Sequence, residues 1–315
     1  MRIAILGAGG VGGYFGGRLA AGAEGTHDVD VVFLARGAHL AALRERGLRI
    51  ESPKGNVHVA RVVATDDPTT IGPVDVVFFS VKLYDTDAAV RMLPPIVGPK
   101  TLVVPLQNGV DSVDVLTRAV GREHVAGGTA YVAAVISEPG VIRHTAMDRL
   151  IVGPLDGQAE QALPALEDLL QACKRAGFDA TMSRNIAVDI WAKFVRLTAF
   201  SGMTTVTRCP IGALRDDPAL AEMMRGALKE SMAVALAGGV PLTDALIDEV
   251  QVATAALPPN ARSSMLEDLE RGRPLELPWL SGAVVRIGRD VGVPTPIHQF
   301  ITTVLTPHVN GASRR

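Results

Sequence analysis

Six residues near the N-terminus have the types and spacing of a phosphate-binding turn. They are Gly7, Ala8, Gly9, Gly10, Val11 and Gly12. They follow a short apolar run at residues 2–6 and open a stretch of helical periodicity at residues 10–22. In this pattern the first glycine allows a tight turn, the second lets the backbone approach a pyrophosphate, and the third lets the helix pack closely on the strand. A glycine-rich turn without a function is the alternative, but the position between strand and helix favours a dinucleotide site at the helix N-terminus.

The end of the next apolar run, residues 29–34, indicates which dinucleotide to expect. NAD sites usually place Asp or Glu there, where the carboxylate accepts a hydrogen bond from the ribose 2′-hydroxyl. This run is followed by Ala35, Arg36 and Gly37, without a carboxylate. The guanidinium group of Arg36 offers several donors to a 2′-phosphate. We therefore predict NADP(H) as the cofactor, with a surface arginine that caps a loop as the alternative interpretation.

Polar residues also end two further apolar runs. Lys82 follows the run at residues 74–81, and Asn108 follows the run at residues 101–106. Ligands of parallel sheets bind at the carboxyl ends of the strands. Lys82 could approach a cofactor phosphate or ribose, and the amide of Asn108 can both donate and accept hydrogen bonds beside a nicotinamide ribose and a substrate. Asn108-Gly109 is equally well interpreted, when taken alone, as a plain turn.

The elements that position these residues alternate between strand and helix in the first half of the chain. Predicted strands lie at residues 2–6, 29–34, 74–81, 101–106, 125–137 and 150–153, and residues 48–50 and 57–60 form a predicted short hairpin with its turn at residues 53–55. Predicted helices lie at residues 10–22, 38–46, 85–93, 110–120 and 158–175. This order predicts a parallel sheet with helices on both faces.

The character of the sequence changes near residue 184. Predicted helices then follow one another, with prolines between them, at residues 185–200, 216–238, 242–255, 262–271, 278–291 and 296–307. We predict an α/β Rossmann domain over residues 1–182, followed by an all-α domain over residues 183–315.

The composition excludes several classes of protein. The chain has 315 residues, of which 48% are hydrophobic and 20% charged, with a formal net charge of −2. These values are typical of a globular protein and leave no basic footprint for nucleic acid. The two cysteines, Cys173 and Cys209, lack the spacing of a zinc site or a disulfide framework. We expect no metal, no membrane segment or secretion signal, and a cytoplasmic location.

Taken together, these features resemble the ketopantoate reductase (2-dehydropantoate 2-reductase) family over nearly the whole chain. The matching segments are Gly7–Gly17, Arg36-Gly37, the strand ending in Lys82, Leu106–Gly109, Trp191–Phe194, Ser263–Asp268 and Glu276. The resemblance implies a Rossmann domain followed by a helical domain, with the active site in the cleft between them. It also implies NADPH-dependent reduction of the 2-keto group of ketopantoate to pantoate, a step toward pantothenate and coenzyme A.

The resemblance assigns roles to four residues. Lys193 matches the catalytic lysine, and an ammonium group there would stabilise the charge that builds on the keto oxygen and donate a proton to it. Glu276 matches the glutamate that holds the developing hydroxyl and the lysine. Asn108 matches an asparagine that contacts substrate and cofactor ribose, and Ser264 matches a serine that binds the substrate carboxylate. Glu276 is also expected to contact the cofactor. Without the resemblance, each would be interpreted as an ordinary surface, capping or helix residue.

The chain departs from the family pattern on the substrate side. Three positions where the family usually has asparagine, and two positions after Glu276, are occupied by Leu197, Ser201, Ala261, Pro278 and Ser281. A site with fewer hydrogen bonds and a more apolar wall should prefer a different keto acid or bind ketopantoate weakly.

Three functions are therefore compared. The first is ketopantoate reductase, and the second is an NADP-dependent reductase of another 2-keto acid or related carbonyl compound, which Leu197, Ser201 and Ala261 favour. The third is a non-catalytic NADP-binding sensor, against which the pairing of Lys193 with Glu276 argues. The expected partner is a small 2-keto acid, and the resemblance is compatible with a monomer or a homodimer.

Overall fold

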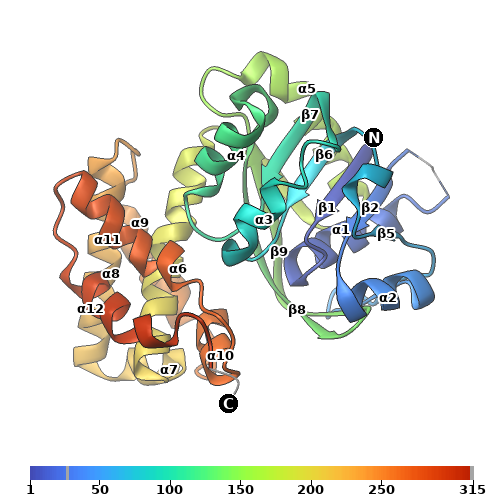
Figure 1. Cartoon of the computed structure of the whole chain (residues 1–315). Helices are drawn as coiled ribbons and strands as arrows, with labels where there is room; N and C mark the ends of the chain where they lie inside the picture. Colours follow the sequence, from blue (N-terminus) through green and yellow to red (C-terminus); the bar gives the residue numbers. More distant parts are fainter. Residues whose placement is uncertain (26–27, 313–315) are drawn as a thin grey trace. The chain divides into compact units, whose positions relative to one another are not determined.

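The computed structural model describes residues 1–25 and 28–312, with the side chains of residues 159–161 excepted (Figure 1). The chain forms two compact units. Unit 1 comprises Met1–Gln107 and Asp111–Ile186, and unit 2 comprises Asn108–Val110 and Ala187–Arg315.

A five-stranded parallel sheet lies at the centre of unit 1, with the strand order β5-β2-β1-β6-β7. Its strands are β1 (Arg2–Leu6), β2 (Asp30–Leu34), β5 (Val63–Thr65), β6 (Val74–Phe79) and β7 (Val97–Pro105). Ile3, Ile5 and Phe78 are fully buried, as expected for interior strands covered on both faces. The helices associated with this sheet are α1 (Gly10–Gly22), α2 (Gly37–Arg46), α3 (Thr86–Val90) and α4 (Ser112–Val120). The predicted α/β Rossmann fold with a parallel sheet is confirmed.

Unit 1 also contains a second sheet, of which the sequence predicted only the hairpin at residues 48–50 and 57–60. It is mixed, with the order β10-β9-β3-β4, and β8 pairs antiparallel with β9. Its strands are β3 (Leu48–Glu51), β4 (Val57–Val59), β8 (Gly127–Glu138), β9 (Val141–Gly153) and β10 (Asp179–Met182). Helix α5 (Ala159–Arg175) follows β9. The first part of β9 escaped prediction because exposed polar residues interrupt its apolar pattern, and β5 and β10 were too short to recognise.

The described residues of unit 2 contain helices and no strand, in agreement with the predicted all-α region. The helices are α6 (Ile186–Thr207), α7 (Ile211–Asp216), α8 (Pro218–Ala237), α9 (Ala245–Ala255), α10 (Ser264–Glu270), α11 (Ser281–Asp290) and α12 (Pro296–Leu305). Helix α6 extends beyond residue 200, where the prediction ended it, because small and β-branched residues in its last two turns are buried rather than exposed as a loop.

A buried hydrogen-bond network holds α6 in place within unit 2. The Thr198 hydroxyl lies 2.9 Å from that of Ser231, which lies 2.9 Å from Nε2 of His298. Nδ1 of His298 in turn lies 3.2 Å from the Ser281 hydroxyl. Burial lowers the pKa of His298 to about 4, so the ring is neutral at pH 7 and acts as a structural link. The network joins α6, α8, α11 and α12, and it fixes the helix on which Lys193 lies.

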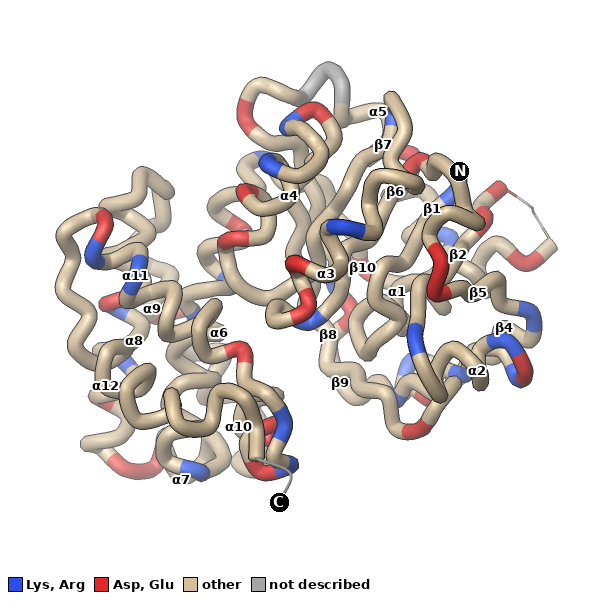
Figure 2. Tube along the Cα trace, viewed as in Figure 1, with Lys and Arg blue, Asp and Glu red and all other residues tan. Residues whose placement is uncertain are grey.

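Charged residues are interspersed along both units rather than gathered in one block (Figure 2). Over residues 1–25 and 28–312, no helix is both long and apolar enough to cross a membrane. Over the same ranges, no group of His, Cys, Asp or Glu is arranged to hold a metal ion.

Candidate functional site

The glycine-rich turn between β1 and α1 has the backbone geometry that a pyrophosphate requires. Gly7 has a φ of 103°, in the left-handed region, and a Cβ atom there would lie 2.7 Å from the backbone nitrogen of Val81. A Cβ at Gly12 would collide with the Gly7 carbonyl and the Ser80 hydroxyl. A Cβ at Gly9 would meet no atom within 4 Å. Two of the three glycines are thus required by packing, whereas Gly9 keeps open the space in front of the turn.

The first turn of α1 is suited to an anion. Gly9 is its N-cap, so no side chain caps the helix, and no acidic residue lies in the first turn. The N–H groups of that turn and the positive end of the helix dipole are therefore suited to phosphate oxygens. The arrangement fits the predicted dinucleotide with Gly7, Ala8, Gly9, Gly10, Val11 and Gly12 around its phosphates.

Replacing Gly9 by alanine is expected to leave the fold intact and to weaken cofactor binding. The added methyl group would occupy the open space and keep the pyrophosphate from the backbone, which should raise the Kd for NADPH about 100-fold. Titration by isothermal calorimetry measures this Kd, and the melting temperature reports on folding. Gly12→Ala is the matched comparison, because there the collision lies inside the protein and should lower the melting temperature. Unchanged NADPH affinity in Gly9→Ala would contradict the assignment of the turn.

Two polar residues that the sequence analysis did not single out support this end of the sheet. The hydroxyl of Ser80 donates to the Gly7 carbonyl at 2.9 Å. The buried Gln107 amide donates to the Val81 carbonyl at 3.0 Å and to the Thr86 hydroxyl at 2.9 Å. Gln107 therefore joins the loop after β7 to both sides of the loop after β6. The position of Gln107 beside Asn108 at a strand end was the only sequence signal for such a role. The partners of its side chain could be known only from the fold.

Arg36 and Lys82 lie at the ends of β2 and β6, on either side of β1. The Arg36 side chain is 75% exposed, and its guanidinium lies 2.8 Å from the Asp85 carboxylate. Lys82 is the N-cap of the short helical turn η2 (Leu83–Asp85). Both cations lie at the carboxyl ends of strands, the edge at which ligands of parallel sheets bind. The sequence analysis did not anticipate the carboxylate of Asp85 beside Arg36.

Three of the predicted site residues meet inside unit 2. Lys193 lies on α6, Glu276 precedes the turn η4 (Leu277–Trp279), and Asn108 belongs to the short segment Asn108–Val110. The Lys193 ammonium donates to the side-chain carbonyl of Asn108 at 3.2 Å, and the Asn108 amide donates to the Glu276 carboxylate at 3.2 Å. One orientation of the Asn108 amide serves both contacts, so the three side chains form a chain from cation to anion.

The electrostatics of this group suit proton transfer near neutral pH. Desolvation lowers the pKa of Lys193 from 10.5 to about 8, and attraction to the Glu276 carboxylate opposes part of that shift. Glu276 is itself only 5% exposed. An ammonium with a pKa near 8 is still mainly protonated at pH 7 and can release its proton more readily than a solvated lysine.

Ser264, the fourth predicted residue, does not join this group. It is exposed in the first turn of α10, and within the described chain it makes no hydrogen bond to Lys193, Asn108 or Glu276. Its neighbour Ser263 is buried and caps α10 by accepting a hydrogen bond from the Leu266 N–H at 3.1 Å. The substrate-binding role of Ser264 stays a prediction.

The departures from the family pattern have different structural consequences. Leu197 and Ala261 are partly buried and pack against the helical core. Ser201 is 1% exposed, and its hydroxyl has no hydrogen-bond partner within the described structure. Ser281 is bound to His298 in the network described above. The position one helical turn after Lys193 is thus apolar, and the position two turns after it has a hydroxyl available for a further partner.

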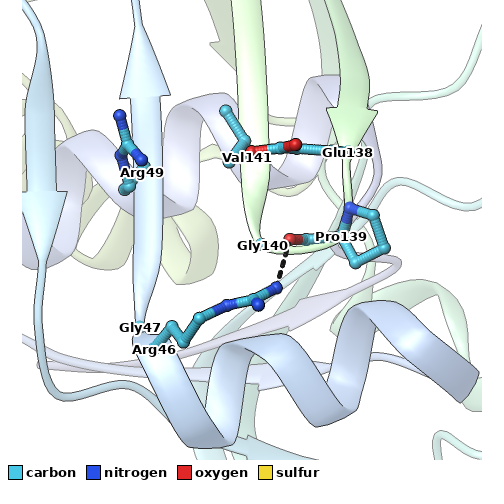
Figure 3. A pocket seen from close by; sticks show the side chains of 7 residues that line it. All are labelled: Arg46, Gly47, Arg49, Glu138, Pro139, Gly140 and Val141. Atoms are coloured by element: carbon cyan, nitrogen blue, oxygen red, sulfur yellow. Dashed lines mark hydrogen bonds between the residues drawn. The ribbon is translucent and has the colours of Figure 1, made fainter.

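A surface hollow of about 230 Å³ lies elsewhere, in unit 1 (Figure 3). Its lining residues are Arg46, Gly47, Arg49, Glu138, Pro139, Gly140 and Val141. The guanidinium of Arg46 donates to the Pro139 carbonyl at 3.3 Å, as Figure 3 shows, and stabilises the turn between β8 and β9. The hollow includes none of the predicted site residues, and its charged side chains are exposed, so we assign it no role in the chemistry.

Several known proteins are similar to this chain over most of its length. The family model described as "Ketopantoate reductase PanE/ApbA" matches residues 3–157, and the model of the C-terminal part of the same family matches residues 185–308. A relative from Bacillus subtilis named "Uncharacterized oxidoreductase YkpB" is 30% identical over 96% of both chains. A 2-dehydropantoate 2-reductase from Mesorhizobium japonicum is 30% identical over 94% of both chains.

Solved structures are similar to this chain as well. A ketopantoate reductase of the PanE/ApbA family from Ralstonia eutropha has a TM-score of 0.86 and 31% identity, over 98% of both chains. D-mandelate dehydrogenase in a ternary complex with NADH and anilino(oxo)acetate has a TM-score of 0.87 at 22% identity, again over 98% of both chains. At that identity the second likeness shows the fold alone.

Proposed function

The chain belongs to the ketopantoate reductase family, and on that basis we propose that it reduces 2-dehydropantoate to pantoate with NADPH. It is an oxidoreductase, and membership of this family implies a nicotinamide dinucleotide as its cofactor. The observation that supports the proposed reaction best is the chain of side chains Lys193–Asn108–Glu276, because it presents one cation of lowered pKa with a fixed partner.

In this proposal Lys193 acts on the keto oxygen of the substrate. The bound, reduced nicotinamide supplies a hydride to the keto carbon. Negative charge then develops on the oxygen, where the Lys193 ammonium stabilises it and donates the proton that completes the hydroxyl. Asn108 orients the ammonium through its side-chain carbonyl, and Glu276 keeps Lys193 protonated through its charge.

The remaining assignments follow the division of the sequence. We assign cofactor binding to residues 1–182, with Arg36 and Lys82 toward the 2′-phosphate and with Asn108 and Glu276 as further cofactor contacts. We assign catalysis to residues 183–315, with Ser264 toward the substrate carboxylate. A role in pantothenate biosynthesis, a cytoplasmic location and a homodimer are parts of the same proposal that rest on the resemblance.

A second candidate is reduction of another 2-keto acid by the same chemistry. Leu197 favours it, because a partly buried apolar side chain lies one turn after Lys193 on α6. A site with an apolar group at that position forms fewer hydrogen bonds to a hydroxylated substrate and accommodates an alkyl side chain better.

The deciding experiment follows loss of the NADPH absorbance with ketopantoate and with a panel of 2-keto acids of increasing side-chain size. Ketopantoate should give the highest kcat/KM if the first proposal is right. Turnover of an alkyl 2-keto acid, with little of ketopantoate, would replace it with the second candidate. Binding of NADPH without reduction of any carbonyl compound would leave the sensor hypothesis.

A further inference from the structure

The ion pair between Arg36 and Asp85 joins the ends of the two strands that flank β1. Arg36 follows β2, and Asp85 ends the turn that follows β6, while the glycine-rich turn follows β1 between them. The guanidinium-to-carboxylate distance is 2.8 Å. The residue that would bind a 2′-phosphate therefore already has an anionic partner from its own fold.

The Asp85 carboxylate is the better anchored of the two partners. Its side chain is 32% exposed, against 75% for Arg36. The backbone N–H of Asp85 donates to the Lys82 carbonyl at 2.9 Å, which closes the turn. Gln107 binds Val81 on one side of this turn and Thr86 on the other. A ligand can therefore displace the more exposed guanidinium of Arg36, while the turn holds the backbone of Asp85 beside the same place.

We propose that Asp85 determines the cofactor preference of this chain: it competes with the 2′-phosphate of NADPH for Arg36 and accepts a hydrogen bond from the 2′-hydroxyl of NADH. The carboxylate that an NAD site has at the end of its second strand is absent here, and Asp85 supplies it from the end of β6. The inference rests on the proposed dinucleotide site. Asp85 limits the specificity of that site for NADPH, so that NADH is bound as well.

The charges explain why Asp85 should disfavour NADPH relative to NADH. A 2′-phosphate adds negative charge beside the Asp85 carboxylate, and like charges at short range repel. The 2′-hydroxyl of NADH adds no charge and can donate a hydrogen bond to the same carboxylate. Asp85 therefore weakens the binding of NADPH selectively and favours NADH.

Asp85→Asn tests the proposal, with the Kd of each reduced cofactor measured separately by calorimetry in the absence of any keto acid. The Kd for NADPH should fall about five- to tenfold, because a partly exposed charge near a phosphate has an effect of that order. The Kd for NADH should stay the same or rise. The change in NADPH affinity should shrink at high salt, where exposed charges are screened.

Asp87→Asn is the matched control. Asp87 is exposed on α3, two residues after Asp85, and its substitution removes the same charge. It should leave both Kd values unchanged. Equal effects of Asp85→Asn and Asp87→Asn, equal effects on the two cofactors, or no effect of Asp85→Asn would overturn the proposal. Since no keto acid is present, a failure of the proposed reaction does not alter these outcomes. If the unaltered chain binds neither cofactor, the dinucleotide site is wrong as well.

Discussion

Lys193→Met is expected to lower kcat for keto-acid reduction by about 10³–10⁴-fold, because the variant loses both the charge that stabilises the developing alkoxide and the proton that it receives. Methionine has a similar length and no charge, so the loss reports on the ammonium rather than on the space that it fills. The rate of NADPH oxidation at saturating substrate measures the effect. The Kd for NADPH should stay close to that of the unaltered chain, because Lys193 is not among the proposed cofactor ligands.

The same variant is expected to be more stable at pH 7. The pKa of Lys193 falls from 10.5 to about 8 in the folded chain, even after the attraction of Glu276. The unfolded chain therefore binds more protons than the folded chain between these two values, and stability rises with pH across that range. Below pH 8 the desolvated ammonium lowers the free energy of unfolding by its full amount. For a partly exposed group we take that amount as about 1–3 kcal/mol. The stabilities of Lys193→Met and the unaltered chain should converge above about pH 10.5, where lysine is neutral in both states.

Urea unfolding at pH 7 and pH 10.5 measures this difference in the free energy of unfolding. Lys229→Met is the matched control, because Lys229 is exposed on α8 in the same unit, and this variant should change neither kcat nor stability. A Lys193→Met variant that retains a tenth or more of kcat would contradict the role of Lys193 as the acid. A loss of activity together with a loss of stability would point to damage of the fold.

The sequence predicts the parts of the fold that depend on local signals. The glycine-rich turn, its flanking strand and its helix are recognisable because the pattern requires particular residues within a few positions. The helices of unit 2 are recognisable from periodicity and from prolines between them. Of the second sheet, only the hairpin of β3 and β4 was predicted. The pairing of β9 with β3 and with β10 joins segments that are far apart in the chain, and exposed residues interrupt the apolar pattern of β9.

Only part of the candidate site could be predicted from residue types and spacing. Residue types and spacing suggested the glycine-rich turn and Arg36, whereas the roles of Lys193 and Glu276 came only from the resemblance, because a helix lysine and a loop glutamate are ordinary residues. The structure adds that Asn108 bridges these two side chains. The pairing of Arg36 with Asp85 and the three hydrogen bonds of the Gln107 side chain depend on how loops from different strands meet. No local pattern in a single sequence contains that information.

The pH dependence of catalysis should reveal how Glu276 acts on Lys193. Reduction requires the protonated lysine, so kcat/KM should be constant below pH 8 and fall above it, following the Lys193 pKa of about 8. Glu276→Gln removes the negative charge that raises this pKa. The fall should therefore begin at lower pH, by about one pH unit, and kcat/KM at pH 7 should drop about 10- to 100-fold. Depletion of the protonated lysine accounts for about twofold of that drop, and weaker positioning of the ammonium for the rest.

Oxidation of the 2-hydroxy acid provides an independent check, because it requires neutral Lys193 as the base. Its kcat/KM should rise with pH where reduction falls, and Glu276→Gln should move both curves in the same direction. Glu249→Gln, at an exposed position of α9, is the control and should move neither. If Glu276→Gln lowers the rate without moving either curve, Glu276 contacts the substrate without setting the pKa of Lys193. A shift toward higher pH would contradict the electrostatic coupling, because loss of a nearby negative charge cannot favour the ammonium.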